Sequence, residues 1–328
     1  METMFPAKAA KVAIISTFFL ALLNLSAGCG SDGKFTPGET IPCVNADDTA
    51  YIQSGNKYLF HRDLVWDTST GQDLLADLYL PEKGGPFPTI IHTHGGAWVV
   101  GSKGMPMATY FGEHSACRGY AFFDVRYRLA PEIHFPDDIR DIKCAIRWLR
   151  GNAAQYNIDK TRFFSMGGSA GGHLSAMVAL TGKDPYFDPV CPGYLEESFQ
   201  LQGAIPFYGV HDWVNWMDTR TFGLNQQYFG LPADATDQEI QAMLVKVSPV
   251  TYAADAPGPF LIIQGDEDVG VPVAQGQALH DALIAAGKDA RLVYIEGANH
   301  AFDMWRDSPF TAKATQEVDD FLAEVMPP

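Results

Sequence analysis

The segment at residues 165–175, SMGGSAGGHLS, is the feature that most restricts how this chain can fold. It follows a strand-like run at 161–166 and leads into an apolar run at 170–180 that is typical of a helix. Ser169 therefore stands in a Gly-x-Ser-x-Gly turn between a strand and a helix. Such a turn is strained and tight, which explains the flanking glycines, and it lifts the hydroxyl above the sheet. The alternative is a turn that serves packing alone.

A serine hydroxyl at such a turn becomes a nucleophile only with a base, and the base needs an acid to orient it. The apolar run 291–295 leads into a loop that ends at His300, which we expect to be the base. The apolar run 259–265 leads into a loop with three carboxylates: Asp266, Glu267 and Asp268. Both loops follow a strand, where α/β sheets bind ligands. This spacing alone leaves the acid open, and each carboxylate could instead cap the helix that begins near Pro272.

A third loop, His94-Gly95-Gly96-Ala97, follows the β-branched run 88–94. A His-Gly-Gly loop upstream of such a serine typically supplies backbone N–H groups that stabilise an oxyanion. His92 and His94 share one face of this strand, which could suggest a metal site. Because no Cys, Asp or Glu cluster at ligand spacing accompanies them, we expect no metal.

Several stretches of the chain, together with His94–Trp98 and including parts of the loops above, resemble one known family. They are residues 127–132 (YRLAPE), 135–136 (FP), 167–174 (GGSAGGHL), 248–252 (SPVTY), 265–268 (GDED) with 271–272 (VP), and 297–302 (GANHAF). From Tyr58 to the C-terminus the chain resembles bacterial esterases of the hormone-sensitive-lipase-like group. Within that group, the resemblance is closest to the BD-FAE-type branch.

The resemblance implies specific roles for the residues in these loops. Ser169 would be the nucleophile and His300 the base. Asp268 would be the acid, because the family pattern places Asp shortly before Val-Pro, and Asp266 would structure its loop. The oxyanion would be bound by three backbone N–H groups: those of Gly96, Ala97 and Ala170. No cofactor is implied.

The chain departs from many of these relatives at three positions. Gly168 stands where they carry Asp, and Gln264 replaces a frequent His. Ala97 stands where many carry a third glycine, and its N–H serves the oxyanion hole on the condition that φ there is negative. None of these changes removes a chemical role.

Strand-like and helix-like runs alternate over residues 57–328. We predict eight strands: 57–66, 74–80, 89–94, 121–126, 162–165, 202–208, 259–264 and 291–295. Helical spacing of apolar residues predicts helices at 136–155, 273–286 and 312–325. With no linker between these elements, 57–328 is expected to be one α/β domain. The resemblance implies that it is an α/β-hydrolase catalytic domain, a mostly parallel eight-stranded sheet with helices on both faces.

Residues 211–231 break this rhythm and are rich in aromatic side chains. The rings could be core beneath a long connection, or they could form the wall of an apolar pocket above Ser169. Four residues are candidates for substrate binding: Trp98, Tyr208, Trp213 and Trp216.

The N-terminus has the pattern of an export sequence. Two lysines precede an apolar run at 12–25, which is shorter than the roughly 20 residues that span a membrane. Small residues then lead to Cys29, as in a bacterial lipobox, so we expect a lipoprotein signal peptide at 1–28 and lipidation of Cys29. Ordinary cleavage near Ala27 is the alternative. Residues 29–56, poor in apolar periodicity, are expected to be a flexible tether. The protein would be a cell-envelope lipoprotein, or else secreted or periplasmic.

Composition limits the partners. The net charge of −16 opposes nucleic-acid binding, and contact with a membrane is expected only through the lipid.

In an exported protein the four remaining cysteines allow up to two disulfides in three pairings, unless they stay free. These cysteines are Cys43, Cys117, Cys144 and Cys191.

We therefore expect a serine carboxylic ester hydrolase that forms an acyl-enzyme from a neutral, short-chain or aromatic ester, free or linked to a polymer. Amide hydrolysis on the same fold, as in an arylformamidase or aminopeptidase, is an alternative. Another is a non-catalytic binding module on the cell surface. The acyl and alcohol parts of the substrate, and the oligomeric state, do not follow from the sequence.

Overall fold

A nine-stranded sheet organises the part of the chain that the computed structural model describes, residues 39–43, 57–216, 219 and 223–328. The described residues all belong to one unit, Phe35–Pro328. The strand order is β1-β2-β3-β5-β4-β6-β7-β8-β9. The strands are β1 (Glu39–Pro42), β2 (Lys57–Asp67), β3 (Leu74–Pro81), β4 (Phe87–Thr93), β5 (Ala121–Val125), β6 (Ile158–Gly168), β7 (Gly203–Phe207), β8 (Phe260–Gly265) and β9 (Ala290–Ile295).

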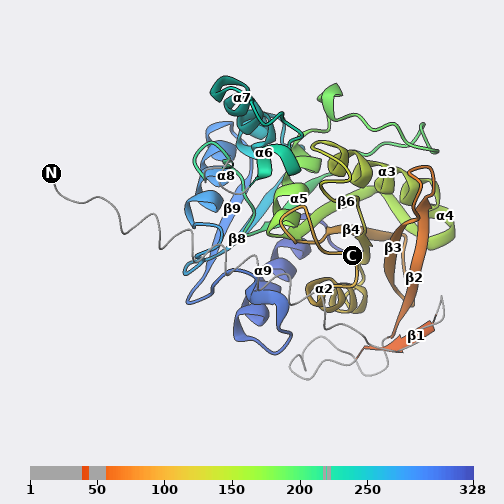
Figure 1. Cartoon of the computed structure of the whole chain (residues 1–328). Coiled ribbons are helices and arrows are strands. Elements are labelled where there is room, and N and C mark those ends of the chain that lie inside the picture. The colour runs from red at the N-terminus through yellow and green to blue at the C-terminus, as the bar shows by residue number, and fades with distance from the viewer. Residues whose placement is uncertain (1–38, 44–56, 217–218, 220–222) are drawn as a thin grey trace. The chain divides into compact units, whose positions relative to one another are not determined.

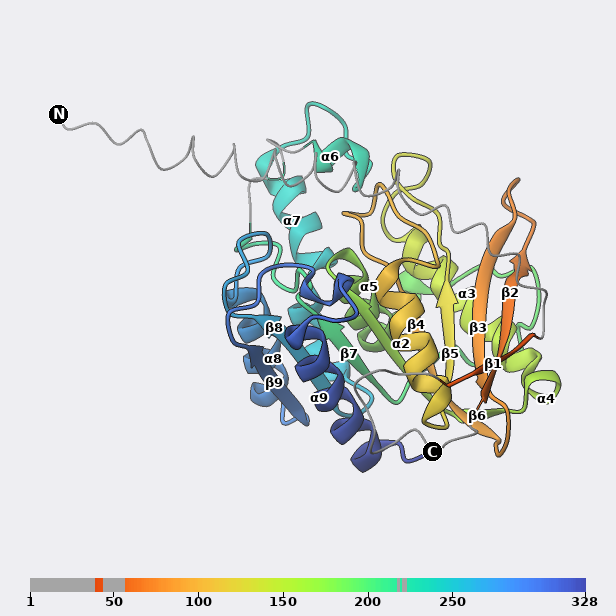
Figure 2. The same cartoon turned by 90° about the horizontal axis from the view of Figure 1, so that it is seen from below.

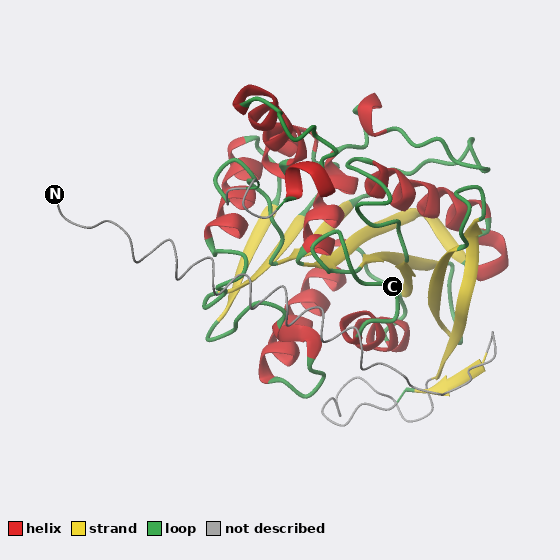
Figure 3. Cartoon of the chain, viewed as in Figure 1, coloured by secondary structure: helices red, strands yellow, loops and turns green. Residues whose placement is uncertain are grey.

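Six strands, β4 to β9, run parallel, whereas β1, β2 and β3 add antiparallel pairs at one edge. Figure 3 shows the strands as one continuous sheet between helical layers. The mostly parallel sheet that we predicted is confirmed, but it has nine strands rather than eight. The additional strand, β1, lies within the segment 29–56 that we expected to be a tether.

Helices cover both faces of the sheet, as predicted (Figures 1 and 2). One apolar layer includes side chains of α2 (Pro106–Cys117) and α9 (Pro309–Val325). The other includes side chains of α3 (Asp137–Gly151), α5 (Ala170–Leu180) and α8 (Ala274–Ala285). Because helices cover both faces, every residue of β4 is buried, as is typical of a central parallel strand.

Shorter helices complete the fold. They are α4 (Ala153–Tyr156), α6 (Leu224–Gln227), α7 (Asp237–Val247), and three 3-10 turns, η1 (Pro185–Phe187), η2 (Pro249–Asp255) and η3 (Phe302–Met304). The predicted helix at 136–155 is α3 followed by α4. Its four apolar residues at helical spacing are fully buried: Ile139, Ile142, Ile146 and Leu149. None of the helices in the described ranges is both long and apolar enough to cross a bilayer.

Two disulfides select one of the three pairings that the sequence allowed. Cys43 is bonded to Cys117 at the end of α2, and Cys144 in α3 is bonded to Cys191. The first bond, with the pairing of β1 to β2, attaches residues 39–43 to the sheet. The prediction of a flexible tether over residues 29–56 was therefore wrong for residues 39–43. Residues 29–38 and 44–56 lie outside the described residues, as do the expected signal peptide and Cys29.

Candidate active site

Ser169 lies in the strained turn that its flanking glycines predict. Its backbone has φ 59° and ψ −121°, which is unusual for a residue with a side chain. The turn joins the end of β6 directly to the start of α5. A Cβ atom at Gly171 would lie 2.0 Å from the carbonyl oxygen of Thr93, so only glycine allows α5 to approach β4 this closely.

The structure brings Ser169, His300 and Asp268 into one chain of hydrogen bonds. The Nε2 atom of His300 is 2.9 Å from the Ser169 hydroxyl, and its Nδ1 atom is 2.8 Å from Oδ2 of Asp268. The side chains of His300 and Asp268 are almost fully buried. The three residues come from the carboxyl ends of β6, β8 and β9, which meet at one edge because these strands are parallel.

Asp268 is held in place by its own loop. Its Oδ1 atom accepts hydrogen bonds from the N–H groups of Gly270 and Val271, each at 2.8 Å. Its Oδ2 atom accepts from Nε2 of Gln264 at 3.1 Å as well as from His300. Gln264, noted in the sequence only as a departure from many relatives, thus helps to orient the carboxylate.

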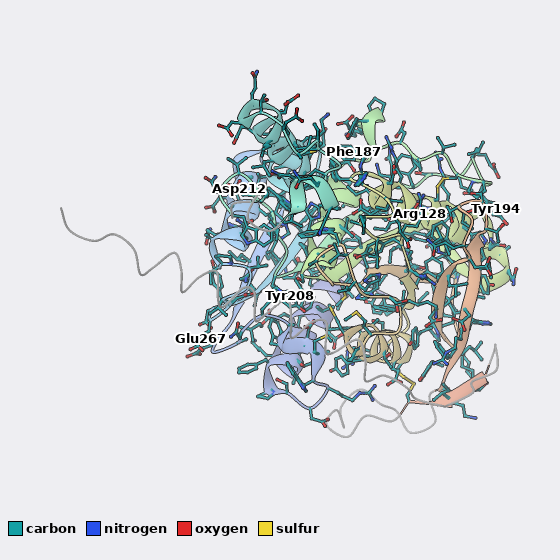
Figure 4. The ribbon with its side chains drawn as sticks, in the orientation of Figure 1. Arg128, Phe187, Tyr194, Tyr208, Asp212 and Glu267 are labelled. Atoms are coloured by element: carbon teal, nitrogen blue, oxygen red, sulfur yellow. A yellow bond between two sulfur atoms is a disulfide. The ribbon has the colours of Figure 1, made fainter. Side chains whose placement is uncertain are left out.

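The other two carboxylates of this loop do not bind His300. Asp266 is exposed, and its Oδ1 atom accepts from the N–H of Gly297, which supports the predicted loop-structuring role. Glu267 is exposed at the periphery of the molecule (Figure 4). Of the three candidates, Asp268 therefore has the geometry that an orienting acid requires.

The His94–Ala97 loop lies against Ser169. A Cβ atom built at Gly95 would be 3.4 Å from Cβ of Ser169. Within the described part of the chain, no backbone carbonyl accepts from the N–H of Gly96 or Ala97. The N–H of Ala170, at the first position of α5, has no partner within its helix. These three N–H groups, predicted as oxyanion donors, are thus not used by backbone structure.

The condition that we placed on Ala97 is not met, since its φ is +51°. Trp98 follows with φ +64°, so two residues with side chains adopt the left-handed region in succession. The turn is closed by Val99 and Val100, whose N–H groups both donate to the Gly96 carbonyl. A left-handed backbone here explains why many relatives carry glycine at this position. The donor role of Ala97 remains a prediction.

Most of the predicted substrate-binding aromatics are buried. Trp98 is 3 % exposed and Trp213 is 0 % exposed, and their rings pack 4.7 Å apart. Trp98 also stacks on Tyr228 at 5.0 Å. These rings pack as core, which is the first of the two alternatives that the sequence left open, and a role for them in substrate binding stays a prediction. Trp216 is partly exposed and remains a candidate.

Tyr208, labelled in Figure 4, is buried as well, but it lies beside His300. Its ring packs edge-on against the His300 imidazole at 4.8 Å. Its hydroxyl donates to Asp303, a fully buried carboxylate that the sequence analysis missed. Asp303 stands three residues after His300, and burial raises the pKa of its carboxyl to about 6. Tyr208 therefore contacts both the His300 ring and the Asp303 carboxyl.

His92 in β4 and His94, which directly follows this strand, have partners within the protein. Nδ1 of His92 is 2.7 Å from Oδ1 of Asp124 on the neighbouring strand. Nδ1 of His94 donates to the Gly95 carbonyl, and burial lowers the pKa of His94 to about 4. The two side chains thus contribute to the sheet and to the shape of the glycine loop.

This sheet, with the serine turn after β6 and the acid and histidine loops after β8 and β9, defines an α/β-hydrolase fold. The BD-FAE family model matches residues 76–283, and the chain belongs to this family.

The chain is similar to several esterases. It is 36 % identical over 248 residues to the probable carboxylic ester hydrolase LipM of Mycobacterium tuberculosis, and 32 % identical over 241 residues to esterase LipQ of that organism. These alignments cover 74 % and 73 % of this chain but 55 % of each relative. The chain thus spans about half the length of these curated relatives.

Solved structures show the same fold. Esterase Est2 of Thermogutta terrifontis superposes with a TM-score of 0.66 at 28 % identity, covering 80 % of this chain and 92 % of that one. A truncated carbohydrate esterase from gut microbiota superposes with a TM-score of 0.65 at 24 % identity, covering 81 % and 95 %. This second likeness concerns the fold alone.

Proposed function

We propose that this protein is a serine carboxylic ester hydrolase that acts through an acyl-enzyme. The observation that carries the proposal is the continuous chain of hydrogen bonds from Ser169 through His300 to Asp268. The family membership and the named esterases among the relatives support the reaction class. A binding module has no need of a nucleophile, a base and an orienting acid that are hydrogen-bonded to one another.

The mechanism follows from the direction of these hydrogen bonds. Asp268 accepts from Nδ1–H of His300, so Nε2 carries no proton and can accept the Ser169 proton as the hydroxyl oxygen attacks the ester carbonyl. The N–H groups of Gly96 and Ala170 stabilise the oxyanion. Ala97 is proposed as a third donor despite its positive φ, because no backbone carbonyl of the described residues accepts from its N–H. His300 then protonates the leaving alcohol. A water molecule, deprotonated by His300, hydrolyses the acyl-enzyme and releases the acid and Ser169.

We propose a neutral ester with a short or aromatic acyl group as the substrate. The net charge of −16 disfavours acidic substrates. The rings of Trp98 and Trp213 are buried and pack against each other, so they offer no open wall to a long acyl chain. Structures of the Thermogutta esterase are described with propionate or butyrate bound, and such short acids suit this proposal.

A chain-length series of p-nitrophenyl esters, from acetate to laurate, tests the proposal, with ethyl ferulate and acetylated xylan alongside. We expect the highest kcat/KM with short or aromatic acyl groups, and labelling of Ser169 by a fluorophosphonate probe. A p-nitroanilide that is cleaved faster than the matched ester would indicate an amide hydrolase. The absence of both hydrolysis and labelling would indicate a binding module.

We also propose that the protein is exported and lipidated on Cys29, with a signal peptide at 1–28 and a tether that leads into the catalytic domain. The two disulfides support export, because such bonds persist in oxidising compartments.

A further inference from the structure

A hydrogen bond joins the glycine loop to the helix that follows the nucleophile. Nε1 of Trp98 donates to Nδ1 of His173 at 3.1 Å, and both side chains are buried. An indole nitrogen can only donate, so Nδ1 of His173 must be the acceptor and its proton resides on Nε2. That Nε2–H donates to the Val247 carbonyl at 2.8 Å. The neutral Nε2–H tautomer therefore satisfies both ring nitrogens.

Burial keeps this imidazole neutral, since it lowers the pKa of His173 to about 4. The charged form would carry a proton on Nδ1, directed at the indole N–H. The hydrogen bond between Trp98 and His173 is thus maintained throughout the neutral pH range.

The two partners belong to the two segments that carry the expected oxyanion donors. Trp98 directly follows Ala97 in the glycine loop. His173 lies in the first turn of α5, and its backbone N–H donates to the Ser169 carbonyl at 3.0 Å. The side-chain hydrogen bond therefore ties Gly96 and Ala97 to the helix that presents Ala170.

The glycine loop needs such a tie, because its backbone is strained. Ala97 and Trp98 both have positive φ, a conformation that residues with a side chain rarely adopt. The Trp98 carbonyl accepts from the N–H of Ala130 at 2.9 Å, and the indole ring stacks on Tyr228. These contacts hold the carbonyl and the ring faces, while the bond to His173 fixes the ring edge toward α5.

We propose that His173 is a positioning residue for the oxyanion hole, acting through Trp98. This inference rests on the proposed ester hydrolysis. Oxyanion donors act only within about 2.7–3.1 Å of the developing charge, and a misplacement of about 1 Å can cost about 100-fold in rate. Loss of the tie would let the loop N–H groups move relative to Ala170, which weakens binding of the oxyanion more than binding of the ester.

A double-mutant cycle tests this proposal. Trp98→Phe removes the donor and keeps an aromatic ring, and His173→Leu removes the acceptor. We expect each single variant to lower kcat for a short p-nitrophenyl ester about 10- to 100-fold with KM within about threefold, as for a contact that matters in the transition state. The double variant should be no slower than the slower single variant. His173→Asn offers an oxygen near the Nδ1 position, so its kcat should be higher than that of His173→Leu.

His211→Leu is the matched control. His211 is also fully buried, burial lowers its pKa to about 3, and within the described residues neither ring nitrogen has a partner. His211 lies near His173, but its replacement leaves both partners of the Trp98–His173 hydrogen bond in place. We expect the kcat of His211→Leu to lie within about threefold of that of the wild type. The melting temperature of every variant is recorded in parallel.

A second measurement separates positioning from a general loss of structure. A trifluoromethyl ketone forms a tetrahedral oxyanion on the nucleophile, so its inhibition constant should rise in Trp98→Phe by the same factor as kcat falls. Unchanged kcat and inhibition in a folded Trp98→Phe would overturn the inference and leave the proposed function intact. So would a rise in KM alone. A wild-type protein that neither hydrolyses esters nor reacts with fluorophosphonate would overturn both.

Discussion

The Nε2 atom of His300 lies 2.9 Å from the hydroxyl oxygen of Ser169, although 131 positions separate the two residues in the chain. The other imidazole nitrogen is bonded to Asp268, whose second oxygen is fixed by two backbone N–H groups. The proposed base is thus oriented by contacts within the protein. No rearrangement is needed before it can accept the serine proton.

Replacement of the proposed nucleophile is the first test. Ser169→Ala should abolish ester hydrolysis and labelling by a fluorophosphonate, because no other group at this turn can form the acyl-enzyme. The melting temperature should stay close to that of the wild type. Retention of more than about one part in 10³ of the wild-type kcat would contradict the assignment, since losses in such triads are at least of this order.

The acid can be identified by comparing two neighbouring carboxylates. Asp268→Asn should lower kcat about 10³-fold or more, because His300 loses the partner that holds its tautomer. Asp266→Asn is the control from the same loop, and it should cost far less, because this carboxylate binds the Gly297 N–H instead. Steady-state kinetics of both variants decide the matter, and the opposite ranking would assign the role to Asp266.

The buried carboxyl of Asp303 should make stability depend on pH. Burial raises its pKa to about 6, whereas an unfolded aspartate has a pKa near 3.8, and within the described residues its Oδ2 atom has no hydrogen-bond partner. Between these values the folded chain binds more protons than the unfolded chain, so Asp303 reduces the stability as pH rises from about 4 to about 6. Above pH 6 the full penalty is present.

Asp303→Asn should remove this penalty while preserving an oxygen for the Tyr208 hydroxyl. We expect the melting temperature of the variant, relative to the wild type, to increase between pH 4 and pH 7. The exposed Asp234→Asn serves as a control and should show no such trend. A difference between Asp303→Asn and the wild type that is constant over this range would disprove the effect.

The bond between Cys144 and Cys191 should stabilise the fold by closing a long loop in the unfolded chain. The two residues are 47 positions apart, and for loops of this length the expected contribution is about 2–4 kcal/mol. The double variant Cys144→Ala/Cys191→Ala should lose this amount in denaturant unfolding under non-reducing conditions. If its midpoint matched that of the oxidised wild type, the bond would have no stabilising role.

The proposed lipid anchor can be tested on the full chain. The protein should be cleaved before Cys29, carry lipid on that residue and remain with membranes in high salt, because two acyl chains bind far more strongly than one. Cys29→Ser should release an active enzyme from the membrane fraction. Mass spectrometry that finds an unmodified Cys29 in the mature protein would instead support a secreted esterase.

Local sequence patterns determined the elements of this protein and the order of its loops. The strand, the Gly-x-Ser-x-Gly turn and the helix after Ser169 could be predicted, because their residues interact with near neighbours in the chain. The apolar spacing in 136–155 predicted a buried helix face for the same reason. The choice of Asp268 among three carboxylates needed the family resemblance, since spacing alone did not separate them.

Contacts between distant segments were decided only by the tertiary structure. The sequence allowed three pairings of four cysteines, and it did not indicate that residues 39–42 add a strand. It left open whether Trp98 and Trp213 face a substrate or the core, and it did not reveal the bond between Trp98 and His173. Each of these depends on which strands become neighbours in the sheet. That order brings together side chains that share no local pattern.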